Sequence, residues 1–258
     1  MSDAIRSLEP RALWNCFADL NAVAQFAFDQ FDNENGAMLE LQPIAVDDKD
    51  DPEHSKTVLK KVFADDKPVA VIGPLYSNVA MGIKDLIGAQ KIPMVSIFAT
   101  HNNLTKDSKF IFRICASNRR LVKGIAEYLF PEVQKHNLNL IVFKDLNDEY
   151  SMNLADTFRL NIQGLKTNYN EVLFRGVKGL QRLQDLNAKI WNPTRKDVLF
   201  LPLQDITAGH IIAALESFPN MIASVDAVDL AHLTKKIKSQ KTHIKLVNTA
   251  QWLPQKSE

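Results

Sequence analysis

The sequence predicts an α/β protein built of two Rossmann-like lobes with mostly parallel sheets, and three observations lead to this expectation. Short, continuous apolar segments alternate along the chain with segments whose apolar residues recur at helical spacing. That alternation is typical of a doubly wound sheet with right-handed crossovers between its strands. The length of 258 residues suits two modest domains, and the same alternation occurs in both halves of the chain.

The first half begins with an amphipathic helix in which Val23, Phe26 and Phe31 share one face. The strand that follows contains Pro43, which favours an edge position because proline cannot donate to a ladder. The run PVAVIG, residues 68–73, is continuously apolar and typical of a buried parallel strand. The elements expected in this half are helices over 21–33, 53–64 and 76–90 and strands over 39–46, 68–73 and 91–98.

The second half repeats the same alternation of helices and strands. Its expected elements are helices over 117–130, 152–161, 180–190 and 208–217 and strands over 138–143, 170–174, 197–203 and 244–248. The segment 112–118 lies between the two series. We therefore expect a first lobe over residues 1–116 and a second lobe over residues 117–258.

The charge balance, the lengths of the apolar runs and the N-terminal segment bear on the partners and the location of the protein. Lys and Arg number 31 and Asp and Glu number 30, so the net charge of +1 provides no basic surface for nucleic acid. No apolar run approaches the ~20 residues that cross a bilayer, and we expect no membrane insertion. Residues 1–14 lack the apolar centre of a secretory signal, which predicts a cytoplasmic location if this is the native N-terminus.

No motif of a common catalytic or cofactor site is present. The sequence lacks G-x-G-x-x-G, the P-loop, G-x-S-x-G and H-E-x-x-H, so we expect no enzyme activity, no cofactor and no metal site. The six histidines are accordingly expected at the surface. The acidic segment 47–51 is expected to form a turn before a helix rather than a calcium site, because it lacks the central Gly of an EF-hand. Cys16 and Cys115 are too few for a disulfide framework, and a single disulfide and two buried thiols both remain open.

Small polar residues follow two of the predicted strands. Ser77 comes after the strand over 68–73, and Thr100 and Asn102 come after the strand over 91–98. In open α/β sheets, ligands bind outside the carboxyl ends of the strands. Ser77 is placed to cap the helix that begins there and to offer its hydroxyl and amide to an anion. Helix capping alone would explain these residues equally well, so both interpretations stay open at this point.

Four motifs occur in a fixed order between residues 47 and 150. D-D-x-x-D-P occupies 47–52, I-G-P-x-x-S occupies 72–77, I-P-M-x-S-x-x-A-T-x-x-x-L-T occupies 92–105, and D-L-N-D-E-Y ends at Tyr150. In this order they resemble the motifs of the type I periplasmic binding proteins, especially the leucine/isoleucine/valine-binding family. The resemblance is clearest over residues 22–151.

This resemblance implies a two-lobe clamp that is open when empty and closes over a small ligand between the lobes. The serine after I-G-P and the segment at A-T would hold the ligand's carboxylate through hydroxyl and amide groups, and the second-lobe tyrosine would close over the ligand. Tyr76 and Phe98 would form apolar walls, although packing explains them equally well. The acidic residue expected to meet a ligand's ammonium group is not evident, and Asp205 is the candidate substitute. The candidate ligand-binding residues are therefore Ser77, Phe98, Ala99, Thr100, Tyr150, Tyr76 and Asp205.

The implied function is non-catalytic capture of a small carboxylate-bearing ligand, expected to be a branched-chain amino acid. The expected partner is the permease of an ABC transporter, and the expected location is the periplasm or the cell exterior. An alternative from another class is a ligand-sensing or interaction module of a receptor with the same fold, in which ligand binding is degenerate. Relative to the family, the chain is expected to be shortened at both ends, so that the second lobe is incomplete and the segments returning to the first lobe are missing.

Overall fold

The computed structural model describes residues 30, 43–164, 166–186, 194, 196–215, 219–225 and 245–247. The chain divides into two compact units, residues 1–47 and 48–258. In the first unit, Gln30 is helical and residues 43–47 lie outside any strand. The strand predicted over 39–46 is therefore wrong for residues 43–46, where Ile44 is exposed and Pro43 has no N–H to donate. The rest of that strand, and the helix predicted over 21–33 apart from Gln30, lie outside the described residues.

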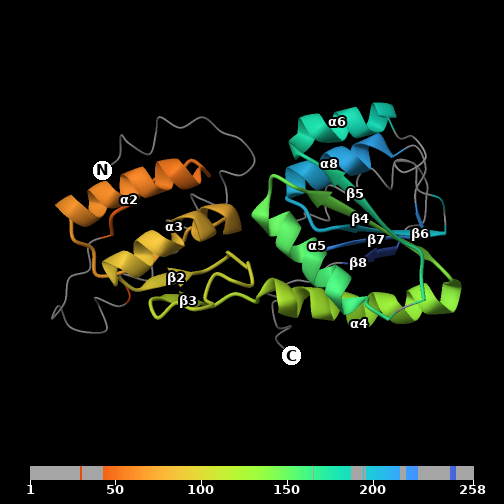
Figure 1. Ribbon diagram of the computed structural model, residues 1–258, viewed down its shortest axis with the longest axis horizontal. Helices are drawn as coiled ribbons and strands as arrows, with labels where there is room; N and C mark the ends of the chain where they lie inside the picture. The colour runs from red at the N-terminus through yellow and green to blue at the C-terminus, as the bar shows by residue number, and fades with distance from the viewer. Residues whose placement is uncertain are drawn as a thin grey trace. The chain divides into compact units, whose positions relative to one another are not determined.

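A small parallel sheet follows in the second unit. Its strands are β1 (Val71–Ile72), β2 (Met94–Ser96) and β3 (Ile111–Arg113), paired in the order β1-β2-β3. Helices α2 (Pro52–Asp65) and α3 (Ser77–Gln90) alternate with these strands along the chain (Figure 1). Apolar side chains of α2, α3, β2 and β3 form one buried cluster that includes Phe63, Ile83, Ile87, Met94 and Ile111.

The opposite face of this small sheet is apolar and exposed. Ile72 and Phe112 are 55% and 54% exposed, and they lie in one row with Val95 because the register pairs Ile72 with Val95 and Val95 with Phe112. The prediction of a buried strand over 68–73 is therefore wrong in its length and its burial. The physical reason is that α2 and α3 both pack on the face that carries Met94 and Ile111.

A larger parallel sheet occupies the rest of the described chain. Its elements are α4 (Asn118–His136), β4 (Asn139–Asp145), α5 (Glu149–Asn161), β5 (Tyr169–Phe174), α6 (Gly176–Leu186), β6 (Asp197–Leu201), α8 (Asp205–Ala214), β7 (Met221–Ser224) and β8 (Lys245–Val247). The strand order is β5-β4-β6-β7-β8, with every pair parallel. The winding direction changes at β4, which has β5 on one side and β6 on the other. This is the doubly wound arrangement expected from the alternating sequence.

Both faces of the larger sheet are buried, which explains its continuous apolar strands. Leu140 and Val142 of β4 pack with α4 and α5, whereas Ile141 and Phe143 pack with α6 and α8. These two helix pairs lie on opposite faces of the sheet (Figure 1). Phe200 of β6 contacts Phe158 of α5, with ring centroids 4.3 Å apart. Strand side chains alternate between the two faces, so both sets must be apolar.

Several predicted boundaries differ from the observed ones. The prediction ended the first helix of this lobe at Phe130, but α4 continues through Pro131 to His136. Helix α5 begins at Glu149, three residues earlier than predicted, because Asp148 caps it by accepting from the amide of Tyr150. Strand β7 was not predicted, since its four residues carry no strong pattern. None of the helices among the described residues is long and apolar enough to cross a membrane.

Candidate functional site

The carboxyl edge of the small sheet collects the predicted first-lobe residues. Ser77 follows β1 and Thr100 follows β2, and these two strands are parallel neighbours. Both side chains are almost fully buried, with 3% of Ser77 and 1% of Thr100 exposed. Because β1 and β2 are parallel neighbours, the loops that carry Ser77 and Thr100 leave the sheet at the same edge. Ligands of α/β proteins bind at this edge.

The N-terminus of α3 presents unpaired amides at this edge. The N-cap residue is Tyr76, whose side chain makes no capping hydrogen bond, and Ser77 is already the first helical residue. The prediction that Ser77 caps the helix is therefore wrong, because a capping side chain must come from the residue before the first turn. The first intrahelical bond runs from the amide of Ala80 to the carbonyl of Tyr76 at 3.0 Å. No described residue accepts from the amides of Ser77, Asn78 or Val79, so this end of the helix can attract an anion.

The loop after β2 adds further donors. The hydroxyl of Thr100 is buried and has no hydrogen-bond partner in the described part of the chain. The amide of Ala99 donates to Ser96 Oγ at 3.2 Å, which shapes the turn, so Ala99 as an amide donor to a ligand stays a prediction. Phe98 is 37% exposed and stands beside these donors in sequence. Neutral hydroxyl and amide donors at a helix N-terminus suit a carboxylate.

The predicted second-lobe residues also follow neighbouring parallel strands. Tyr150 comes after β4 and Asp205 comes after β6, and β4 pairs with β6 beside the point where the winding changes direction. Tyr150 is only 5% exposed and packs in the core with Leu154 and Ala155. Asp205 is the first residue of α8 and is partly exposed. Their ligand roles, like those of Tyr76 and Phe98, stay predictions.

An acidic group that the sequence did not single out lies near this edge of the larger sheet. Burial raises the pKa of the Asp148 carboxyl to about 6, against the hydrogen bonds that it accepts from the amides of Tyr150 and Ser151. The nearby carboxylates of Asp145 and Asp50 raise the pKa further. Burial also raises the pKa of Asp50, whose carboxylate accepts from Asn78 Nδ2 at 3.3 Å. The acidic segment 47–51 forms the expected helix start, because Asp51 accepts from the amide of His54 at 2.6 Å.

His101 departs from the expectation that all histidines are at the surface. Its side chain is buried, because the loop from β2 to β3 folds over it with Asn103 donating from its amide to Nδ1 at 3.2 Å. Burial lowers the pKa of this imidazole, and Glu149 partly opposes the shift with its Oε2 3.6 Å from Nε2. A neutral ring that accepts at Nδ1 carries its proton at Nε2, which faces Glu149.

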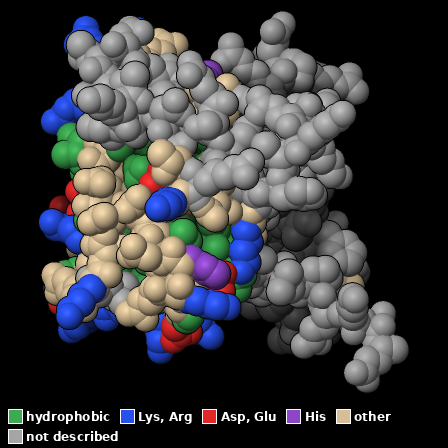
Figure 2. All heavy atoms as spheres, turned by 90° about the vertical axis from the view of Figure 1, so that its right-hand side faces the viewer, with side chains coloured by type: hydrophobic (Ala, Val, Ile, Leu, Met, Phe, Trp, Pro, Cys, Tyr) green, Lys and Arg blue, Asp and Glu red, His purple; other side chains and the backbone are tan. Residues whose placement is uncertain are grey.

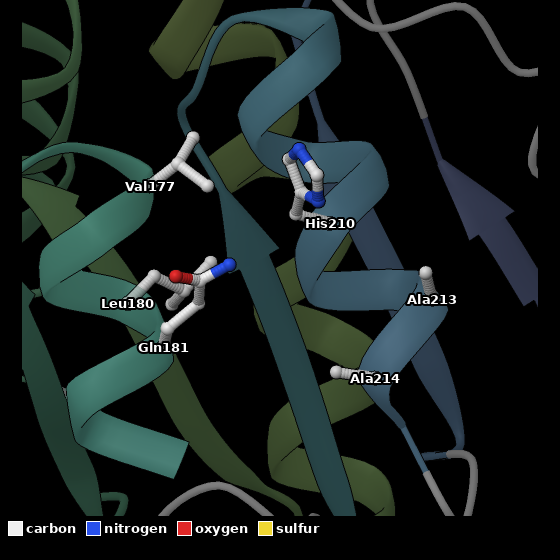
Figure 3. A pocket seen from close by; sticks show the side chains of 6 residues that line it. All are labelled: Val177, Leu180, Gln181, His210, Ala213 and Ala214. Carbon is white, nitrogen blue, oxygen red and sulfur yellow. The ribbon is translucent and has the colours of Figure 1, made fainter.

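A shallow groove lies elsewhere, between α6 and α8. It has a volume of about 260 Å³ and is lined by Val177, Leu180 and Gln181 of α6 and by His210, Ala213 and Ala214 of α8 (Figure 3). None of the predicted ligand-binding residues lines it. Basic and acidic side chains are interspersed over the described part of the face shown in Figure 2. Within the described ranges, no three His, Cys, Asp or Glu side chains are grouped so that they could hold a metal ion.

Only one of the two cysteines lies among the described residues. Cys115 is buried, and its Sγ lies 3.6 Å from the carbonyl oxygen of Ala99. Cys16 lies outside the described residues. Whether the two cysteines pair or form buried thiols therefore stays a prediction.

The fold agrees with that of known proteins. The sequence model of the periplasmic binding protein family matches residues 15–165, more than half of the chain. The chain therefore belongs to this family, and it is similar to type I members of the leucine/isoleucine/valine-binding group. A Leu/Ile/Val-binding protein of Rhizobium johnstonii, BraC3, is 26% identical over 166 residues, which are 62% of this chain and 44% of that protein.

Solved structures show the same fold. The leucine-binding protein LivK of Thermotoga maritima matches with a TM-score of 0.70 at 18% identity, over 86% of this chain and 62% of that one. LivJ of Streptococcus pneumoniae, solved in complex with isoleucine, matches with a TM-score of 0.63 at 21% identity, over 79% and 57% of the two chains. The chain thus spans less than two thirds of the length of these relatives.

Proposed function

We propose that this chain is a non-catalytic solute-binding protein that captures a branched-chain amino acid for an ABC transporter outside the cytoplasmic membrane. The observation that carries the proposal is the carboxyl edge of the small sheet. There the open N-terminus of α3 and the unpartnered, buried hydroxyl of Thr100 follow neighbouring strands. These groups are neutral donors with no competing partner, which is what a buried carboxylate requires.

The ligand's other groups are assigned by the same reasoning. Ser77 and Thr100 bind the carboxylate, with Ala99 as a further donor if its amide turns away from Ser96. Tyr76 and Phe98 flank the apolar side chain of the ligand. Tyr150 and Asp205 approach from the larger sheet, with Asp205 accepting from the ammonium group. A ligand held from both sheets stabilises the closed arrangement, because it contacts both at once.

Thermal unfolding in the presence of candidate ligands tests this function. A ligand that binds only the folded chain raises the melting temperature in proportion to the logarithm of its concentration above Kd. We expect L-leucine, L-isoleucine and L-valine to raise it, whereas leucinol, which lacks the carboxylate, leaves it unchanged. The panel also includes benzoate and other simple carboxylates, which share the carboxylate but lack the ammonium group.

The site assignment is tested by Ser77→Ala combined with Thr100→Val. The double variant should lose the leucine-induced shift while keeping the melting temperature of the ligand-free protein within a few degrees. Thr57→Val, an exposed site on α2, is the control and should bind as the unmodified chain does. A full leucine shift in the double variant would refute the assignment, and no shift with any ligand in the unmodified chain would refute the function.

A further inference from the structure

The loop that carries Thr100 is fastened to the larger sheet's helices by one asparagine. The amide of Asn102 donates to Asn153 Oδ1 at 3.1 Å, and its Nδ2 donates to Thr157 Oγ1 at 2.9 Å. Its Oδ1 accepts from the amide of Arg119 at 2.8 Å. Asn153 and Thr157 belong to α5 and Arg119 to α4, so all three bonds leave the small sheet.

These partners are also bonded to one another. Asn153 Oδ1 accepts a second bond, from Asn118 Nδ2 at 2.9 Å, and the Thr157 hydroxyl donates to the carbonyl of Asn153 at 2.6 Å. Asn118 is fully buried and Thr157 is 8% exposed. We call Asn102, Asn118, Asn153 and Thr157 the asparagine cluster. Asn118 Oδ1 is buried without a hydrogen-bond partner in the described part of the chain, so the order of the cluster depends on the bonds that Asn102, Asn153 and Thr157 make.

The same loop caps α4. The first two amides of α4 have no partner within the helix, and the loop supplies both acceptors. The amide of Asn118 donates to the carbonyl of Thr100 at 2.8 Å, and the amide of Arg119 donates to Asn102 Oδ1. Thr100 therefore has its backbone fixed against α4, while its hydroxyl remains without a partner.

We propose that Asn102 and Thr157 are positioning residues, which hold Thr100 in the geometry that binds the ligand without touching the ligand themselves. The proposal rests on the proposed function for the role of Thr100. Without the bond between Asn102 and Thr157, the loop samples more conformations, and ligand binding must then order it. The cost of that ordering appears as weaker affinity. The cluster also ties this half of the site to α4 and α5.

The matched pair Thr157→Val and Thr157→Ser separates positioning from packing. Valine keeps the volume of threonine but leaves Asn102 Nδ2 without its acceptor, whereas serine keeps the hydroxyl. Thr57→Val is the control, since Thr57 makes the same kind of hydroxyl bond to the carbonyl four residues earlier, Glu53, but lies on α2. Each variant is measured by calorimetric titration with L-leucine and by amide hydrogen exchange in the absence of ligand.

We expect Thr157→Val to weaken leucine binding by about tenfold, the effect of one lost buried hydrogen bond. In the ligand-free protein it should speed exchange at the amides of Asn102 and Arg119 and leave β4 and β6 unchanged. Thr157→Ser should bind L-leucine with an affinity within about twofold of that of the unmodified chain. Thr57→Val should have the same affinity as the unmodified chain. Unchanged affinity in Thr157→Val, no rescue by serine, or faster exchange throughout the larger sheet would each overturn the proposal.

The exchange measurement needs no ligand. Failure of the proposed function can therefore be distinguished from failure of the positioning role proposed for Asn102 and Thr157. If the unmodified chain does not bind leucine, the function is refuted for that ligand. Faster exchange confined to Asn102 and Arg119 would then still support the fastening of the loop to α4 and α5. Unchanged exchange at these amides in Thr157→Val would overturn that fastening.

Discussion

At the scale of single residues, Asp148 combines two opposed demands. As the N-cap of α5, its carboxylate accepts from the amide of Tyr150 at 3.1 Å, a bond that favours the charged form. Burial and the neighbouring Asp145 and Asp50 disfavour the same charge, and they prevail, since the pKa rises from 3.8 to about 6. The folded chain therefore holds this proton more tightly than the unfolded chain does.

This opposition predicts a pH-dependent gain from Asp148→Asn, which keeps the capping oxygen and removes the charge. Because the folded pKa lies above the unfolded one, the charge destabilises the fold above about pH 6, and the penalty disappears below about pH 4. We expect the free energy of unfolding to rise by about 2 kcal/mol at pH 7.5, with the gain falling to zero by pH 4. Urea unfolding of both proteins between pH 4 and pH 7.5 measures this difference in unfolding free energy.

Asp85→Asn is the control for that experiment, since it removes an exposed carboxylate from α3. It should change the unfolding free energy little at any pH. A gain in Asp148→Asn that is the same at pH 4 and pH 7.5, or a loss at pH 7.5, would contradict the explanation.

Some of the candidate site residues could be predicted from the sequence, and others could not, for a physical reason. Ser77 and Thr100 could be predicted because each follows a recognisable strand, and adjacent parallel strands end at one edge. The asparagine cluster could not be predicted, since Asn102 and Thr157 are 55 residues apart and meet only through tertiary packing. His101 was misjudged because burial inside a loop leaves no periodic signal.

At the scale of elements, the accuracy of a predicted boundary depends on whether its signal is local. Helix α2 matches its prediction to within one residue at each end, because the D-P start and the spacing of Leu59 and Phe63 are local signals. Strand β1 keeps only two of its six predicted residues in a ladder. Its apolar run reports hydrophobicity, whereas the length of a strand depends on which neighbours pair with it.

The end of α3 offers a test of helix termination. Lys91, its C-cap residue, has a φ of 56°, in the left-handed region that glycine adopts at little cost. We expect Lys91→Gly to raise the free energy of unfolding by about 0.5 kcal/mol, measured by urea denaturation. Lys60→Gly, an exposed position inside α2, should lower it by about 1 kcal/mol. Equal effects of the two substitutions would rule out the assigned end of the helix.

At the scale of the whole molecule, the two sheets differ in how completely they are covered. The larger sheet is buried on both faces, and the smaller one has a buried face and an exposed apolar face. Phe200 is fully buried in the larger sheet, where it packs against Phe158. Phe112 lies on the exposed apolar face of the smaller sheet. Stability should therefore respond very differently to the loss of each ring.

We expect Phe200→Ala to lower the free energy of unfolding by about 3–5 kcal/mol, the cost of a large cavity. Phe112→Ala should change it by less than about 0.5 kcal/mol, as for an exposed side chain. Urea unfolding of both variants under identical conditions makes the comparison. A loss of several kcal/mol in Phe112→Ala would show that this face is covered in solution.

The central claim is that a carboxylate binds where β1 and β2 end. Backbone amide chemical shifts of the uniformly ¹⁵N-labelled chain, followed while L-leucine is added, test it most directly. We expect saturable shifts that are largest at the amides of Ser77, Asn78 and Thr100, because these amides lie at or next to the groups that we propose bind the carboxylate. Saturable shifts centred on the groove between α6 and α8, or none at those three amides, would contradict it.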